Sequence, residues 1–197
     1  MNYLAHTLLA AGDADLEVGG ILGDFVRGRP DPSLPPGLRA GIRLHRAVDS
    51  YTDAHAVVRA ARRLFEPPWR RYAGILLDVW FDHCLARDFD HWSELSLETF
   101  SIRLRQRLTE RMAWLPPRMR RFVAYMQTDN LPAAYADTQV IGRVLEGIGS
   151  RLSRPNPLDH ALPELIARDA ALTHHFNAFF PDLTAFAGSW RERHVRG

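Results

Sequence analysis

Apolar residues recur at helical spacing along most of the chain, and proline-rich stretches divide this pattern into segments. No stretch alternates between apolar and polar residues as a half-buried strand would, and Asn-Gly hairpin signals are missing. We therefore predict an all-α protein. The expected helices are a pair before residue 26, segments near 36–54, 56–65, 69–88, 96–113, 117–129, 137–150 and 159–179, and a last helix from about 182.

Proline pairs stand at the start of two of these segments, at Pro35-Pro36 and at Pro116-Pro117. Proline is tolerated in the first turn of a helix, where its missing N–H has no partner to lose. We therefore expect both pairs to open helices rather than to interrupt them. No linker is long enough to separate two domains, so residues 1–197 are predicted to form one helical bundle.

One of the expected helices is apolar on nearly every side and yet holds two aspartates and a histidine. It contains LLDVWFDHCLARDF, residues 76–89, and a helix with this pattern is a central one, packed by its neighbours. Asp78 and Asp82 are four residues apart and share a face, with His83 one step round. Two buried carboxylates so close together need a positive partner. An arginine would make an ion network and a divalent metal would make a binding site, and the pattern alone leaves both open.

A second polar stripe lies in GIRLHRAVDSYTDAH, residues 41–55. His45, Asp49 and Asp53 step by four and would stack on one helix face, with Arg46 beside the first of them. Such a stripe can be simple pairing within the helix, which contributes only tenths of a kcal/mol. Apolar residues flank it, however, so its polar groups could face a partly dry space in which a cation would satisfy a carboxylate.

Two further polar residues stand in apolar surroundings near the start of the chain. Asp24, in LGDFVRG, ends an apolar run just before a loop, a common place from which to present a ligand to a cleft. His6, in MNYLAHTLL, is an imidazole within an apolar helix. Alone, each is more often a helix-terminal or a core residue with no task. They gain weight only beside the other polar stripes.

The composition is that of a globular protein, with 46% hydrophobic and 24% charged residues and a formal net charge of +2. The apolar runs fall far short of the roughly 20 residues needed to cross a bilayer. No basic start precedes an apolar block as in a signal peptide. The single Cys84 excludes an internal disulfide framework. We therefore expect a cytoplasmic protein with no membrane partner, and the sequence leaves its oligomeric state open.

Every basic side chain other than histidine is an arginine, and three runs concentrate them: RAARR at 59–63, WRR at 69–71 and RMRR at 118–121. Such runs are usually solvated helix faces, but they can also dock an acidic partner or a phosphate. The modest net charge argues against nucleic acid as the partner. Gly-rich phosphate loops, GxSxG, HExxH and CxxC are all missing, which argues against kinases, dinucleotide oxidoreductases and the common serine hydrolases.

Taken together, four ordered segments resemble the bacterial acyl carrier protein phosphodiesterase family: NYLAH, GDFVRG, LHRAVDSYTDAH with VVRAARR, and RRYAGILLDVWFDHCLAR. The resemblance implies a helical fold distantly similar to HD-type metal phosphohydrolases. It also implies hydrolytic removal of the 4′-phosphopantetheine arm from holo-acyl carrier protein with a divalent cation, typically Mn²⁺, with Mg²⁺ or Fe²⁺ as the other candidates. The positions that match the family's polar motifs are His6, Asp24, His45, Asp49, Asp53, Asp78, Asp82 and His83.

The resemblance suggests a role for each polar group. We predict that His45, Asp82 and His83, with Asp24 or Asp78, hold the metal. We further expect Asp49 or Asp53 to orient the attacking water or act as general base, Arg46 to neutralise charge on the phosphoryl oxygens, and His6 to supply a proton to the leaving serine oxygen. The predicted docking face for the acidic carrier protein consists of Arg59, Arg62, Arg63, Arg70 and Arg71.

Two other interpretations stay open at this point. One is an HD-like phosphohydrolase that acts on a nucleotide or another small phosphodiester without needing a protein substrate. The other is a non-catalytic helical binding protein whose buried acids only pair with arginines. Bound divalent metal would argue against the second, and dependence on a protein substrate would argue against the first.

Overall fold

Helices form where the spacing of apolar residues predicts them. The computed structural model describes residues 2–195, and within that range it contains ten α-helices and no strand. The helices are α1 (Tyr3–Leu8), α2 (Ala14–Leu22), α3 (Pro36–Ala54), α4 (Ala56–Arg62), α5 (Ala73–Arg87), α6 (Leu97–Glu110), α7 (Pro117–Thr128), α8 (Thr138–Gly149), α9 (Leu162–Ala167) and α10 (Asp169–His194). The prediction of a single all-α domain is confirmed, whereas the HD-like detail stays a prediction.

Local chemistry explains where several helices begin. Pro36 and Pro117 occupy the first turns of α3 and α7, which confirms that the proline pairs open helices. The side chains of Asp13, Ser96 and Asp137 accept hydrogen bonds from backbone N–H groups in the first turns of α2, α6 and α8. These caps satisfy N–H groups that have no partner within the helix.

One predicted boundary is wrong. We expected a helix to end near residue 179 and another to begin near 182, but α10 continues through Pro181 as one helix of 26 residues. A proline inside a helix costs about 3 kcal/mol because it removes a hydrogen bond and crowds the preceding turn. Buried side chains on both sides of it, among them Phe179, Phe180 and Leu183, anchor the helix to the core and offset that cost. The chain breaks instead at Arg168, between α9 and α10.

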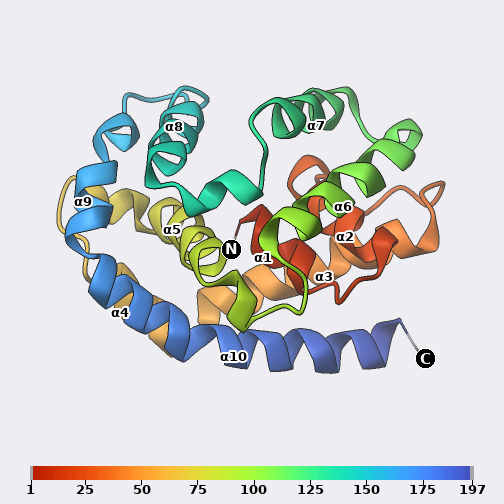
Figure 1. Ribbon diagram of the computed structural model, residues 1–197, viewed down its shortest axis with the longest axis horizontal. Coiled ribbons are helices and arrows are strands. Elements are labelled where there is room, and N and C mark those ends of the chain that lie inside the picture. Colours follow the sequence, from red (N-terminus) through yellow and green to blue (C-terminus); the bar gives the residue numbers. More distant parts are fainter. Residues whose placement is uncertain (1, 196–197) are drawn as a thin grey trace.

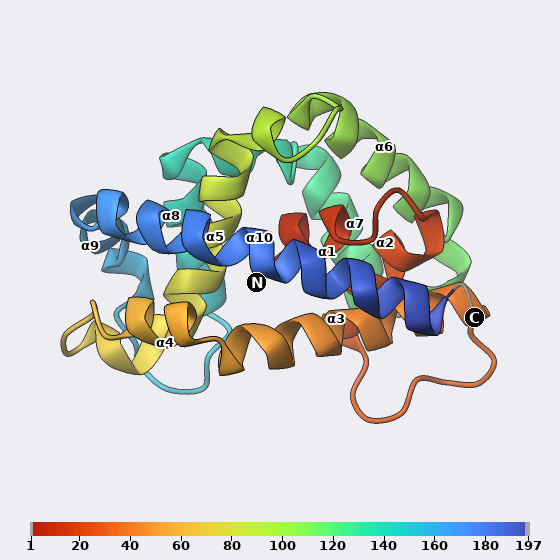
Figure 2. The ribbon, with the colours of Figure 1, turned by 90° about the horizontal axis from the view of Figure 1, so that it is seen from below.

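The long helices surround α5, which is buried on nearly all sides as its sequence predicts. Figure 2 shows α10 and α3 lying side by side along one face, and the two helices are in contact. Figure 1 shows α7 and α8 on the opposite side of the molecule, with the N-terminal end of the chain between and below them. Among the described residues, no helix is long and apolar enough to span a membrane.

Two glycines allow α2 and α3 to pack backbone against backbone. A Cβ atom added at Gly19 would lie 2.5 Å from the carbonyl oxygen of Leu38 and 2.7 Å from the Cα of Gly41. A Cβ at Gly41 would lie equally close to the Cα of Gly19, so neither position has room for a side chain. This close approach holds the end of α2, and the residues that follow it, against the middle of α3.

Candidate metal centre

Two histidines and an aspartate converge where α1 meets α3. The Nε2 atom of His6 lies 3.1 Å from Oδ1 of Asp49, and the Nε2 atom of His45 lies 3.1 Å from Oδ2 of the same carboxylate. The two imidazole rings stack with their centroids 4.0 Å apart. One potential ligand atom from each of these residues lies within 4.8 Å of the other two. A single carboxylate therefore bridges two buried imidazoles.

Asp24 borders this cluster from the end of α2. It lies in the 3₁₀ turn η1 (Gly23–Phe25), and its Oδ1 atom is 3.6 Å from Nε2 of His45. The preceding glycine makes this approach feasible, because a Cβ at Gly23 would lie 2.4 Å from the ring Cγ of His45. The Asp24 side chain keeps 45% of its surface exposed, so this carboxylate faces both the cluster and the outside.

The surroundings set the charges of these groups. Burial lowers the pKa of His6 to about 4, although its hydrogen bond with Asp49 opposes the shift, so the imidazole is neutral near pH 7. Burial alone would raise the pKa of the Asp49 carboxyl, but the hydrogen bonds from His45 and His6 outweigh it and lower that pKa. Burial raises the pKa of the Asp24 carboxyl, with His45 opposing and the charges of Asp49 and Asp78 adding to the increase.

The donor set fits a divalent metal ion. Metal-ligating histidines must be neutral and carboxylates ionised, which is how the surroundings of His6 and Asp49 leave them near pH 7. Imidazole nitrogen together with carboxylate oxygen suits ions such as Mn²⁺ or Fe²⁺. The three residues identified by this geometry, His6, His45 and Asp49, come from two helices that packing brings together.

The other residues predicted for the site lie apart from this cluster. His83 points its Nδ1 atom at the backbone carbonyl of Tyr135, 2.8 Å away. Asp53 forms an ion pair with Arg62 at 2.5 Å, and Arg46 donates a hydrogen bond to the carbonyl oxygen of Val26. These contacts give all three predicted site residues structural partners.

Asp82 is fully buried, and its carboxylate accepts hydrogen bonds from the first turn of α1. Its Oδ2 atom accepts a hydrogen bond from the N–H of Leu4 at 2.7 Å, and its Oδ1 atom accepts one from Ala5 at 3.2 Å. The residue preceding α1 provides no side-chain cap, so a carboxylate from α5 takes that role. Asp78 lies half-buried one turn earlier on α5. The sequence left open whether an arginine or a metal ion satisfies Asp82. In the structure, two backbone N–H groups do so, and the carboxylate caps α1.

This cap should make folding stability depend on pH. Burial raises the pKa of the Asp82 carboxyl to about 7, although the hydrogen bonds from Leu4 and Ala5 oppose the shift. Since the folded protein then holds this proton more tightly than the unfolded chain, stability should fall as the pH rises from about 4 to about 7. We expect the difference in unfolding free energy between the wild type and Asp82→Asn to shrink by at most about 1.4 kcal/mol per pH unit over that range.

Urea unfolding of both proteins in the presence of a chelator, at several pH values between about 5 and 7, measures this difference. The asparagine variant is the matched control, because it keeps the shape of the side chain without the titration. Parallel stability curves would contradict an Asp82 carboxyl whose pKa is raised in the folded state.

The arginines predicted to dock a partner differ in whether they form hydrogen bonds within the protein. Arg63, Arg70 and Arg71 are exposed. Arg59 donates a hydrogen bond to the carbonyl oxygen of Ala54, and Arg62 is held by its aspartate. The first three are therefore the best placed of the set for contact with another molecule.

Sequence reasoning missed a cleft of about 550 Å³ beside Asp24. Its lining includes Arg118 and Arg121 of α7, Arg151 from the loop after α8, and Tyr3. The run RMRR was interpreted as a solvated helix face or a docking patch for an acidic partner or a phosphate, without a cleft. A spacing of three places its first and last arginines on one helix face. No pattern in the sequence points to Arg151, because only the fold brings that loop to the cleft.

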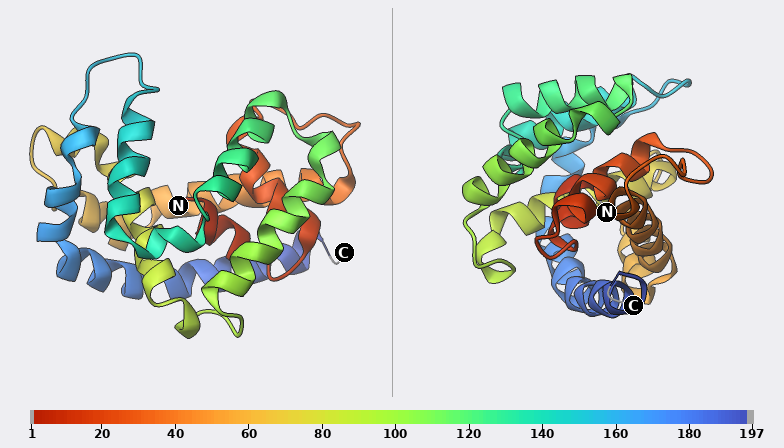
Figure 3. Two further views of the ribbon diagram at one scale, coloured as in Figure 1. Left: turned by 45° about the horizontal axis from the view of Figure 1, so that its top comes forward. Right: turned by 90° about the vertical axis from the view of Figure 1, so that its right-hand side faces the viewer.

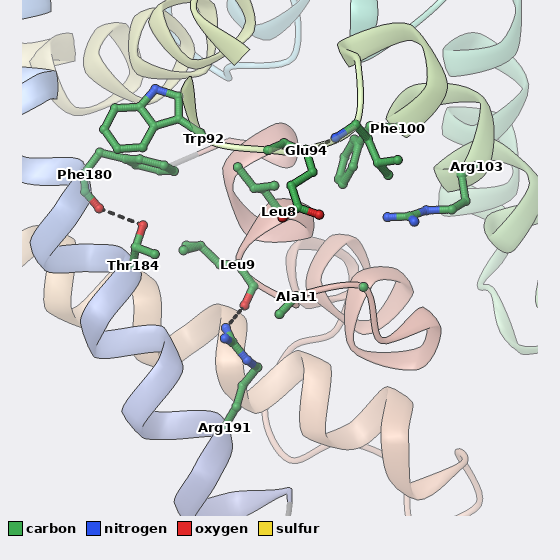
Figure 4. A pocket seen from close by; sticks show the side chains of 13 residues that line it. Leu8, Leu9, Ala11, Trp92, Glu94, Phe100, Arg103, Phe180, Thr184 and Arg191 are labelled. Atoms are coloured by element: carbon green, nitrogen blue, oxygen red, sulfur yellow. Dashed lines mark hydrogen bonds between the residues drawn. The ribbon is translucent and has the colours of Figure 1, made fainter. Parts of the chain in front are cut away.

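A second cavity, drawn in Figure 4, lies elsewhere and contains none of the clustered residues. It encloses about 480 Å³, and its walls are mainly apolar, with Leu8, Phe100 and Phe180 among them. Arg191 reaches across it and donates a hydrogen bond to the carbonyl oxygen of Leu9. The lining of this cavity includes none of His6, His45 and Asp49.

Comparison with known proteins gives a consistent result across the chain. The model of the family described as acyl carrier protein phosphodiesterase matches residues 1–183. A protein of that name from Escherichia coli O157:H7 is 39% identical over 191 residues, covering 95% of this chain and 97% of the relative. A relative of the same name from Shigella boydii serotype 18 is 38% identical with the same coverage. No solved structure matches the chain.

Proposed function

The chain belongs to the acyl carrier protein phosphodiesterase family, and on that premise we propose that it hydrolyses the phosphodiester joining 4′-phosphopantetheine to a serine of holo-acyl carrier protein. Water attacks phosphorus, the bond from phosphorus to the serine oxygen breaks, and the products are apo-acyl carrier protein and 4′-phosphopantetheine. The observation that carries this proposal is the convergence of His6, His45 and Asp49 beside Asp24 at the edge of an arginine-lined cleft.

We propose that this cluster holds a divalent ion, with Mn²⁺ as the first candidate. His6, His45 and Asp49 would be the ligands, and Asp24 lies beside them, 3.6 Å from Nε2 of His45. The ion would supply Lewis acidity toward the phosphoryl group and lower the pKa of the water nucleophile. This assignment replaces the set expected from the sequence, which drew on Asp82 and His83 in place of Asp49 and His6.

The protein's own groups position the reaction. Asp49 fixes the orientation of both imidazoles through its two oxygens, which keeps the Nε2 atoms turned inward. Asp24 is half exposed between the cluster and the cleft, and its raised pKa suits a carboxylate that takes a proton from water. The serine oxygen leaves as an alkoxide and needs a proton, which a protonated Asp24 could return.

The decisive experiment treats purified protein with holo-acyl carrier protein, with and without Mn²⁺ after removal of metal by a chelator. Intact-mass measurement should show loss of the phosphopantetheine mass only when metal is present. A small phosphodiester such as bis(p-nitrophenyl) phosphate, tested in parallel, distinguishes this activity from that of a general phosphodiesterase. No mass loss with any divalent metal would refute the proposal.

We also propose that the exposed arginines between α4 and α5, Arg63, Arg70 and Arg71, dock the acidic carrier protein. Reversing the charge of Arg63 and Arg71 together should raise KM about tenfold at low salt, because electrostatic attraction mainly speeds encounter. The kcat should change little, since neither residue lies in the metal cluster. Arg193→Glu, an exposed reversal on α10, is the matched control. An unchanged KM in the double variant would remove this face from the interface.

A further inference from the structure

The cleft beside Asp24 carries positive charge that the protein itself does not neutralise. Arg118, Arg121 and Arg151 line it, and all three are exposed. Within residues 2–195, none of the three forms an ion pair, whereas Arg62, Arg107 and many other arginines do. Guanidinium groups held free around one small space are well suited to bind phosphate oxygens.

This cleft continues into a further cavity of about 540 Å³, which is distinct from the one in Figure 4. The two share Tyr3, Phe122, Tyr125 and Arg151, so they form one groove with Asp24 at one end. Helix α7 forms one wall and α8 the other, and Figures 1 and 3 show these helices on either side of the N-terminal end of the chain. Each of the two volumes lies in the range of sites for small ligands and cofactors.

The chemistry of the groove changes along its length. At the Asp24 end, three arginines face one carboxylate. Between the two cavities, the ring of Tyr3 packs on that of Phe122 with centroids 4.5 Å apart. The far half is walled by Val144, Gly147 and Ile148 of α8, which are apolar. Its lining also includes polar and charged side chains, namely Asn2, Asp129, Arg143, Glu146 and Ser150. The groove therefore suits a ligand with an anionic end and a mixed amide and aliphatic tail.

Tyr3 lines both halves of the groove and so lies at their junction. Burial, and then the charges of Asp24 and Asp82, raise the pKa of the Tyr3 hydroxyl, while Arg151 and Arg118 act in the opposite direction. Tyr3, Asp24, Arg118 and Arg151 all line the cleft at this end of the groove. An anion between these arginines would sit next to Asp24 and would be covered on one side by an aromatic ring.

Building on the function proposed above, we propose that the groove between α7 and α8 is the binding site for the 4′-phosphopantetheine arm. The phosphate lies among Arg118, Arg121 and Arg151, beside Asp24. The pantetheine chain runs over Tyr3 and along Val144 and Ile148 of α8. The serine and its carrier protein then lie outside the mouth of the groove, on the other side of phosphorus.

Gly147 offers a way to test the tail half of the groove without disturbing the fold. A Cβ added there meets no atom within 4 Å, so Gly147→Leu places a side chain in open space at the groove wall. Leucine also has a higher helix propensity than glycine, which makes unfolding of this variant unexpected. Gly188→Leu on α10 is the matched control, because its only neighbour within 4 Å is the tip of Arg191 and it lies outside the groove. Arg151→Gln tests the phosphate half.

Calorimetry on Mn²⁺-loaded protein should use 4′-phosphopantetheine and, separately, inorganic phosphate as probes. We expect Gly147→Leu to weaken binding of 4′-phosphopantetheine about tenfold and to leave binding of phosphate unchanged, since only the tail is obstructed. Arg151→Gln should weaken both probes, and Gly188→Leu neither. If Gly147→Leu binds 4′-phosphopantetheine as the wild type does, or if the wild type does not bind it, the groove is not the site of the arm.

This measurement separates the binding site from the reaction. Wild-type protein that releases the arm from holo-acyl carrier protein, together with an unaffected Gly147→Leu variant, would keep the proposed function and overturn the groove. Wild-type protein that binds 4′-phosphopantetheine through the groove but releases nothing from the carrier protein would do the reverse. Thermal denaturation of all three variants confirms that they are folded during the comparison.

Discussion

Asp49→Asn is expected to lower kcat/KM for holo-acyl carrier protein by about 10³-fold, a loss typical of removing a central group from an active site. The carboxylate lies 3.1 Å from Nε2 of both His6 and His45, so its neutral replacement removes a charged metal ligand. It also disturbs the contacts that hold the two imidazoles together before metal binds. The amide also presents an N–H₂ group to one of the imidazoles, which disturbs the cluster further. Intact-mass assays of the carrier protein measure the rate, and elemental analysis of the purified variant should show less bound metal.

Asp53→Asn is the matched control, because it separates the prediction from helical spacing from the prediction from the observed contacts. Asp53 is one turn further along the same helix and was an equal candidate on spacing alone, but it is exposed and paired with Arg62. We expect its neutral variant to keep activity within about twofold, since an exposed ion pair contributes little. Equal losses in the two variants, or full activity and normal metal content in Asp49→Asn, would contradict the cluster as the metal centre.

Gly41→Leu is expected to destabilise the protein by about 3 kcal/mol or more, or to prevent folding, because the new side chain collides with backbone rather than with a movable side chain. Its Cβ alone would lie 2.7 Å from both the Cα of Gly19 and the carbonyl oxygen of Leu16. Helices α2 and α3 would have to separate, which also draws Asp24 away from His45. Urea unfolding measures the loss, with Gly188→Leu as the control for a glycine replaced by leucine on an uncrowded helix face. Equal stability in the two variants would mean that α2 and α3 can shift apart at no cost.

The fold was largely predictable from the chain because apolar spacing and proline pairs act locally. The error at Pro181 shows the limit of this approach. The proline predicted the end of a helix, but the burial of phenylalanines close to it stabilises one continuous helix. Contacts between distant segments decide such cases, and no window of sequence contains them.

The candidate site was predictable as a set of residues but not as an arrangement. The pairing of His45 with Asp49 follows from a spacing of four, which any helix preserves. By contrast, Asp82 was expected to bind metal because it is a buried acid, and its partners proved to be backbone N–H groups, which leave no trace in residue identity. His6 was predicted as a proton donor and not as a ligand, since only the packing of α1 brings it to Asp49.

The cap on α1 has a consequence for how the centre comes into being. The four clustered side chains are those of His6, Asp24, His45 and Asp49. All of them lie in the first quarter of the chain, so a fragment ending after α3 would contain every one. Helix α1 has only six residues, too few to be stable in isolation, and its anchor Asp82 belongs to α5. During synthesis, α1 therefore lacks this anchor until α5 has also emerged, although it also packs on α2. The clustered side chains therefore come early in the sequence, but the cap that anchors α1 comes from a helix synthesised later.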